Sequence, residues 1–160
     1  MDAGGARGVR EGHRDHGADR PGALALSRYC LDTSAYSRLS RGDAQITELI
    51  DAADWIGVPS VVVGELLTGF LAGSRRERNE AQLDEFLADP IVEELPVDRE
   101  VARIHAEIIV ALKAAGTPLP TNDIWIAAAS ARAGAPLLTF DEHFLAIGRI
   151  GTILLRAAPG

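Results

Sequence analysis

Four acidic residues stand where a carboxylate is either unusual or well placed for chemistry. Asp32 ends a short apolar segment, Glu65 interrupts a hydrophobic run, Asp123 lies in the first turn of a predicted helix and Asp141 follows another apolar segment. Two unit charges 4 Å apart repel by about 4 kcal/mol at an effective dielectric near 20. If the four carboxylates meet, they need raised pKa values or a cation. Oxygen-only ligands favour Mg²⁺, for which Mn²⁺ can substitute.

A divalent ion held by carboxylates predicts hydrolysis of a phosphodiester bond, because it lowers the pKa of a bound water and stabilises the attacking and leaving oxygens. The hydroxyls or amides of Thr33, Ser34, Asn122 and Thr139 stand beside the acids and are candidates for orienting a carboxylate or a water. Each acid also has a structural explanation. Asp32, Asp123 and Asp141 suit helix starts or turns, and Glu65 is explained by a surface-facing position.

Alternating apolar segments predict the elements that must position these residues. Short apolar segments bounded by turn residues predict strands at 28–32, 55–59, 91–95, 136–139 and 152–155. Helical spacing predicts helices at 34–39, after Asp43, at 61–71, at 74–87, after Asp98, from Thr121 to Gly134 and at 143–147. Ser34, Asp43, Asp98 and Thr121 are the predicted N-caps.

Strands that alternate with helices predict right-handed crossovers and a mainly parallel sheet covered on both faces. The expected fold is therefore an α/β protein, a three-layer α/β/α sandwich with about five strands. Residues 28–160 are predicted to form its single domain. Residues 1–27 are rich in glycine and in balanced charges and show no apolar period, which predicts a disordered leader. His13 and His16 in this leader are interpreted as solvated residues rather than a metal pair.

Composition restricts the class of protein. The chain of 160 residues is 47% hydrophobic and carries a net charge of −7, which disfavours broad electrostatic adhesion to nucleic acid. No apolar run approaches the roughly 18 residues that a membrane span needs. A single cysteine, Cys30, excludes an intramolecular disulfide and is typical of the cytoplasm; we expect it in the core. His105 lies on an apolar helical stripe, which predicts a hydrogen-bonded core residue.

Four motifs together resemble the PIN domain, and more narrowly the VapC-type toxins of type II toxin–antitoxin pairs. They are Leu31-Asp32-Thr33-Ser34, Glu65 after a Pro-Ser helix start, the segment 122–128 (NDIWIAA) and the segment 138–144 (LTFDEHF). The resemblance covers about residues 28–156. It implies a Mg²⁺- or Mn²⁺-dependent endoribonuclease that cuts structured RNA such as tRNA or rRNA. Asp32, Glu65, Asp123 and Asp141 match the acidic catalytic and metal-binding residues, and Thr139 matches a neighbouring catalytic hydroxyl.

The resemblance also implies a homodimer and a cognate small antitoxin protein that lies across the toxin. Helices 34–39 and 61–71 are the predicted groove for this partner. Its candidate lining is Val62, Leu66, Phe70 and Leu71, for which an ordinary core position is the alternative. Arg75, Arg76 and Arg78 are interpreted as contacts to RNA phosphates or as ion pairs with Glu77 and Glu80. The alternative function is a catalytically inactive PIN-like domain that serves as a protein-binding module.

Overall fold

The computed structural model describes residues 26–159, so the predicted leader lies outside the described residues except for Leu26 and Ser27. One sheet of five parallel strands runs through the described part of the chain in the order β3-β2-β1-β4-β5. The strands are β1 (Arg28–Leu31), β2 (Trp55–Pro59), β3 (Val92–Leu95), β4 (Leu137–Thr139) and β5 (Thr152–Leu154).

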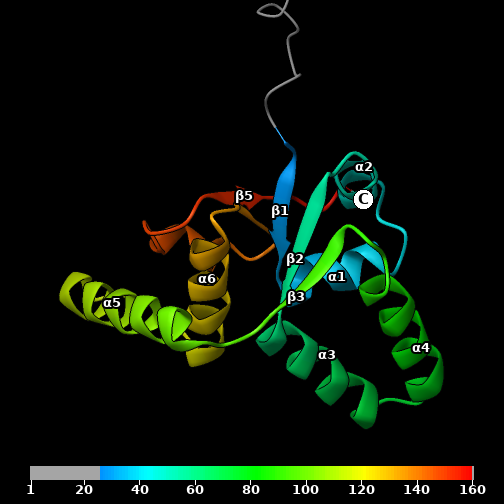
Figure 1. Ribbon diagram of the computed structural model, residues 1–160, viewed down its shortest axis with the longest axis horizontal. Helices are drawn as coiled ribbons and strands as arrows, with labels where there is room; N and C mark the ends of the chain where they lie inside the picture. The colour runs from blue at the N-terminus through cyan, green and yellow to red at the C-terminus, as the bar shows by residue number, and fades with distance from the viewer. Residues whose placement is uncertain (1–25, 160) are drawn as a thin grey trace, which may run out of the picture.

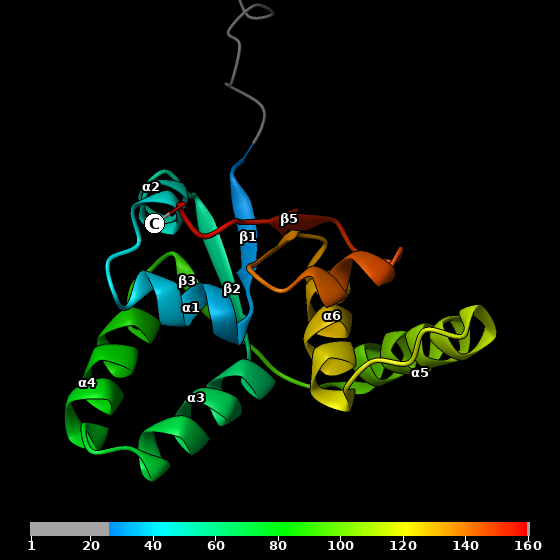
Figure 2. The ribbon, with the colours of Figure 1, turned by 180° about the vertical axis from the view of Figure 1, so that it is seen from behind.

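Helices cover both faces of this sheet (Figure 1). The connections are α1 (Thr33–Leu39) and α2 (Ala44–Asp51), α3 (Ser60–Ala72) and α4 (Arg76–Leu87), α5 (Arg99–Ala115) and α6 (Thr121–Ala133), and the 3₁₀ helix η1 (Glu142–Ala146). Helices α1, α2 and α4 lie on one side, and α5 and α6 lie on the other, as the reverse view also shows (Figure 2). The predicted three-layer α/β/α fold is confirmed.

The central strands are apolar because a parallel sheet covered on both faces leaves them no wet side. Cys30 and Leu31 in β1, Val58 in β2 and Leu137 and Leu138 in β4 are all fully buried. Cys30 is therefore a core residue, as predicted, and burial raises the pKa of its thiol to about 11. The register pairs Leu31 with Leu138, so β1 and β4 end side by side at one edge of the sheet.

Two predicted helix caps are wrong. Asp32, not Ser34, caps α1: its extended backbone ends β1, and its side chain accepts a hydrogen bond from Ala35 N. Pro120, not Thr121, precedes α6, which has no side-chain cap bond. Asp43 and Asp98 cap α2 and α5 as predicted. Several other element boundaries differ from the predicted ones by one or two residues.

His105 does not make the hydrogen bond predicted for it. Its imidazole stacks on the Trp125 indole, with the ring centroids 3.6 Å apart, and its Nε2 atom is buried without a hydrogen-bond partner. Burial lowers the pKa of this imidazole, which keeps the ring neutral. A stacked neutral ring thus joins α5 to α6. Among the described helices, none combines the length and the apolar character that crossing a membrane requires.

Candidate active site

The four predicted acids line one pocket at the carboxyl edge of the sheet, where α/β folds place their ligands. Asp32 directly follows β1, and Asp141 lies two residues beyond the end of β4. Glu65 comes from the second turn of α3, and Asp123 comes from the first turn of α6. The pocket has a volume of about 270 Å³, and its other lining residues are Thr33, Ser34, Ser37, Ile126 and Phe144.

Asp32 is the most firmly held of the four carboxylates. One oxygen accepts hydrogen bonds from Ala35 N and from Ser34 Oγ, both at 2.8 Å, and the other accepts a hydrogen bond from Thr139 Oγ1. The Asp32 residue is only 3% exposed. Burial raises the pKa of Asp32, the hydrogen bonds from Thr139, Ala35 and Ser34 oppose that rise, and the charge of Asp141 adds to it. Several donors therefore orient a carboxylate that is costly to ionise.

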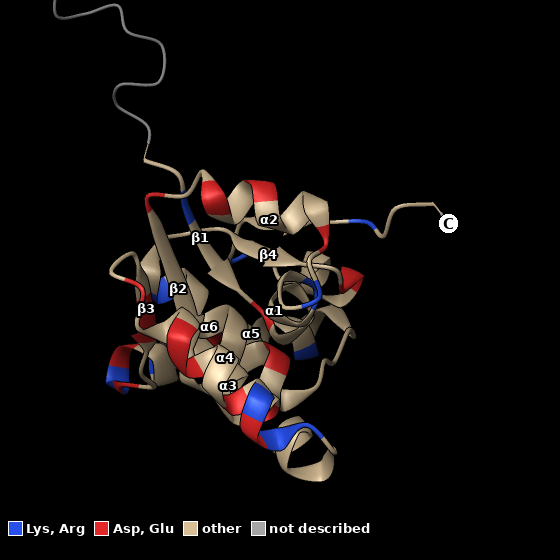
Figure 3. Cartoon of the chain, turned by 90° about the vertical axis from the view of Figure 1, so that its right-hand side faces the viewer, with Lys and Arg blue, Asp and Glu red and all other residues tan. Residues whose placement is uncertain are grey.

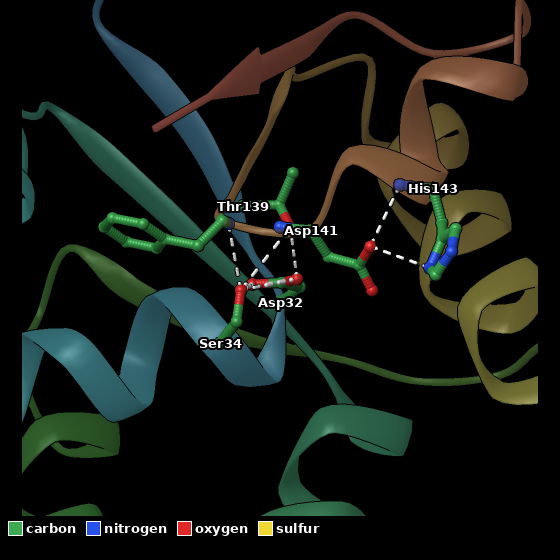
Figure 4. A network of polar contacts seen from close by, with 6 residues as sticks. Asp32, Ser34, Thr139, Asp141 and His143 are labelled. Atoms are coloured by element: carbon green, nitrogen blue, oxygen red, sulfur yellow. Dashed lines mark hydrogen bonds and ion pairs between the residues drawn. The ribbon is translucent and has the colours of Figure 1, made fainter. Parts of the chain in front are cut away.

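Thr139 and Ser34 connect this carboxylate to the end of β4 (Figure 4). The Thr139 hydroxyl donates to Asp32 and accepts a hydrogen bond from Asp141 N at 2.9 Å. The Ser34 hydroxyl donates to Asp32 and accepts one from Phe140 N at 3.0 Å. These two hydroxyls hold the ends of β1 and β4 in a fixed relation, which is the positioning role that the sequence suggested for them.

Glu65 and Asp141 contact donors at the rim of the pocket. Thr33 Oγ1 donates to Glu65 Oε1 at 3.1 Å. Asp141 Oδ1 accepts a hydrogen bond from His143 N and lies 2.9 Å from His143 Nδ1 (Figure 4). His143 therefore belongs to the site through Asp141, although its side chain is 65% exposed. In the sequence, the position of His143 two residues after Asp141 was the only signal of this contact.

The electrostatics of Asp123 show that the four carboxylates act on one another. Burial raises the pKa of Asp123 to about 6, and the charges of Asp141, Glu65 and Asp32 add to the rise, in that order. Only His143 opposes it. Since like charges interact this strongly only at short range, the sequence hypothesis that distant acids meet at one place is supported by the geometry and by the electrostatics.

The donor set fits a hard cation in its chemistry, because the four carboxylates and three hydroxyls that line the pocket supply only oxygen atoms. As the side chains stand, no three Asp, Glu, His or Cys side chains within residues 26–159 are grouped closely enough to hold one ion. Asp32, Glu65 and Asp141 are each turned toward protein donors instead. Binding an ion would therefore require rotation of some of these side chains.

Two neighbouring pockets share residues with the acidic pocket. Ser34 and Asp141 also line a wider pocket of about 670 Å³ that contains Arg38, whose guanidinium lies 4.7 Å from the centre of the Phe140 ring. Ser37 also lines a pocket between α1, α3 and α4 that contains Arg41, Arg75 and Arg78. Sequence reasoning assigned no role to Ser37 or Arg41. Ser37 lies four residues after Thr33 on α1, and this helical spacing was the available signal.

Comparisons with known proteins agree with this fold. A family model for the PIN domain matches residues 29–150. Ribonuclease VapC5 of Mycobacterium tuberculosis is 32% identical over 117 residues, which cover 73% of this chain and 85% of that protein. The VapBC-5 toxin–antitoxin structure from the same organism is also 32% identical, with a TM-score of 0.64, and covers 82% of this chain and 99% of the other. VapBC2 of Rickettsia felis, bound to a fragment of promoter DNA, is 21% identical with a TM-score of 0.73 and covers 80% of this chain and 98% of its own.

Proposed function

This chain belongs to the PIN-domain family, and on that premise we propose that it is a Mg²⁺- or Mn²⁺-dependent endoribonuclease, the toxin of a toxin–antitoxin pair. One observation carries the proposal: carboxylates from four separate elements line a single pocket. Two curated relatives, each 32% identical, are the ribonucleases VapC5 and VapC4, which supports RNA as the substrate class. We expect a structured RNA such as tRNA or rRNA.

We propose that Asp32, Glu65, Asp123 and Asp141 hold the ion. When bound, a divalent cation supplies activation of water and neutralises charge that develops on the phosphate oxygens. Thr139 and Ser34 orient the Asp32 carboxylate through their hydroxyl donors. Burial and mutual repulsion raise the pKa values of Asp32 and Asp123, and an opposite charge nearby favours the ionised forms. Ion binding should therefore favour loss of a proton from both groups, and for Asp123, whose pKa is about 6, the release should be measurable around that pH.

Incubation of the purified protein with total cellular RNA tests the proposed activity. We expect discrete cuts that require Mg²⁺ or Mn²⁺ and disappear in the Asp123→Asn variant. Glu142→Gln is the matched control, because Glu142 is an exposed acid next to Asp141 that does not line the pocket. Cleavage that persists in excess EDTA, or in both variants alike, would contradict the assignment. An inactive domain that only binds a partner protein would give no cuts and no metal binding.

We also propose a small antitoxin partner, which the VapBC toxin–antitoxin structures support. Of the predicted groove residues, Val62 and Leu66 are buried in the core, Leu71 is 59% exposed, and Leu66 and Phe70 line the pocket between α1, α3 and α4.

The predicted homodimer is proposed as well. Val110 on α5 and Leu145 on η1 are 67% and 58% exposed, and each is next in sequence to a residue that lines an apolar groove of about 470 Å³ between these elements. Sedimentation of the purified chain measures its oligomeric state.

A further inference from the structure

The pocket that shares Ser37 with the acidic site is lined mainly by polar and basic side chains. It lies between the C-terminal half of α1 and the hairpin of α3 and α4 and has a volume of about 270 Å³. Arg41 comes from the turn after α1, and Arg75 and Arg78 come from the start of α4. Ser37, Ser40, Asn79 and Gln82 add hydroxyl and amide groups, and Tyr36, Leu66 and Phe70 complete the lining. Basic residues gather where α3 passes into α4 (Figure 3).

The three arginines of this pocket are not explained by the stability of the fold. In the described part of the chain, Arg38, Arg76 and Arg149 form ion pairs with carboxylates, whereas Arg41, Arg75 and Arg78, like most of the other described arginines, form none. Arg75 and Arg78 also sit at the N-terminal end of α4, where the helix dipole disfavours cations. In a chain with a net charge of −7, three arginines gathered around one pocket indicate an anionic ligand.

We propose that Arg41, Arg75 and Arg78 bind backbone phosphates of the substrate RNA next to the bond that is cut. Ser37 lines both pockets, so a strand whose scissile phosphate lies among the four acids can place a neighbouring phosphate among the arginines. Hydroxyl, amide and arginine groups are the usual partners of phosphate oxygens. The site would hold RNA against the repulsion of the acidic centre. This inference rests on the proposed ribonuclease function.

A segment of the proposed partner protein, whose predicted groove includes Leu66 and Phe70, is the competing occupant of this pocket, and the mainly polar lining favours RNA. A partner helix in a groove is held by a row of apolar contacts, whereas hydroxyl, amide and arginine side chains supply most of the lining here. Because this pocket adjoins the acidic pocket at Ser37, an RNA strand bound at the reaction site can extend through it. A segment that merely docks needs no such continuity.

The test compares variants that remove the same charge inside and outside the pocket. Arg75→Gln/Arg78→Gln removes two pocket arginines, and Arg41→Gln removes the third from a different element. Arg76→Gln is the matched control, because Arg76 is adjacent in sequence but pairs with Glu80 and does not line the pocket. A fluorescent RNA hairpin is titrated against each variant in the Asp123→Asn background, which prevents cleavage, across a series of salt concentrations. Thermal unfolding checks that each variant folds.

We expect the double variant to bind the hairpin about tenfold more weakly, with the slope of log K against log salt reduced by about 1.4, since each phosphate contact on a single strand contributes about 0.7. Arg41→Gln should reduce the slope by about 0.7, and Arg76→Gln should leave it nearly unchanged. In the cleavage-competent protein, KM for the RNA should rise with kcat retained. If the double variant does not fold, Arg41→Gln alone decides.

A parallel titration with polyglutamate serves as the acidic-peptide probe. Three results would overturn the inference: unchanged RNA binding in the pocket variants, an equal loss of RNA binding in Arg76→Gln, or loss of polyglutamate binding in the pocket variants while RNA binding is retained. The last result would assign the pocket to an acidic peptide. These outcomes are distinct from failure of the proposed function. If the unaltered protein cuts no RNA with Mg²⁺ or Mn²⁺, the ribonuclease proposal fails whatever the arginine variants show.

Discussion

Replacing Asp123 with asparagine should stabilise the protein at neutral pH when no metal is present. Burial and the charges of Asp141, Glu65 and Asp32 raise the pKa of Asp123 from 3.8 to about 6. The folded state therefore favours the protonated form, and the ionised carboxylate costs stability at higher pH. Asparagine keeps the shape of the Asp123 side chain and removes its charge. The variant should unfold at a higher urea concentration than the unaltered chain.

The size and the pH range of this effect follow from the same pKa. A rise from 3.8 to about 6 corresponds to roughly 3 kcal/mol at 1.36 kcal/mol per unit. Asp123 is partly exposed, so solvent screening should reduce this by about half. Loss of the favourable interaction of Asp123 with the start of α6 subtracts about 0.5 kcal/mol more. The expected gain is therefore about 1 kcal/mol.

Urea unfolding in EDTA at a series of pH values tests this reasoning. Below pH 3.8 the carboxyl is neutral in both states, and the variants should be equally stable. The gain should grow up to about pH 6 and stay constant above it. Asp84→Asn is the control, because Asp84 is an exposed acid in the last turn of α4 and does not line the pocket. A gain that is independent of pH, or a loss at neutral pH, would refute the argument that repulsion and burial strain this carboxylate.

Three further perturbations have definite expected outcomes. Mn²⁺ should raise the melting temperature of the unaltered chain and do so much less in Asp32→Ala, because an ion that binds only the folded state stabilises it; equal shifts in calorimetry would contradict the ligand assignment. Thr139→Val should lose about 1–3 kcal/mol of stability and most RNA cleavage, since it removes the buried donor to Asp32; unchanged turnover would show that this hydroxyl has no positioning role. Gly57→Ala should lose about 1–3 kcal/mol in urea unfolding, because its Cβ would lie 2.5 Å from the Trp55 ring and 2.8 Å from Leu95; an unchanged midpoint would mean that both side chains move freely.

The layers and the acidic pocket were predictable because they rest on regular patterns. Short apolar segments such as Tyr29–Leu31 favour buried strands, and the acids that follow β1 and β4 then share one edge of the parallel sheet. Glu65 was recognisable because a carboxylate within an apolar helix needs a reason, and the structure gives it a place on the pocket wall. The positions of the acids relative to the apolar segments were therefore enough to predict the pocket.

The predictions that were wrong concern features that depend on backbone angles and on side-chain rotation. Asp32 takes the cap of α1 from Ser34 because its own backbone is extended and its carboxylate already points at Ala35 N. The hydrogen bond predicted for His105 is replaced by stacking on Trp125, a contact between helices that no single periodicity encodes. The actual orientation of each acid, and hence the number of ions bound, is likewise decided by rotation within the pocket.

The position of β1 in the middle of the sheet has a consequence for synthesis of the protein. Its neighbours are β2 and, more than a hundred residues later, β4. Asp32 thus leaves the ribosome long before Asp123, Thr139 and Asp141 exist to complete the pocket. A nascent or prematurely terminated chain therefore lacks the complete pocket, and the proposed activity requires nearly the whole chain to be translated.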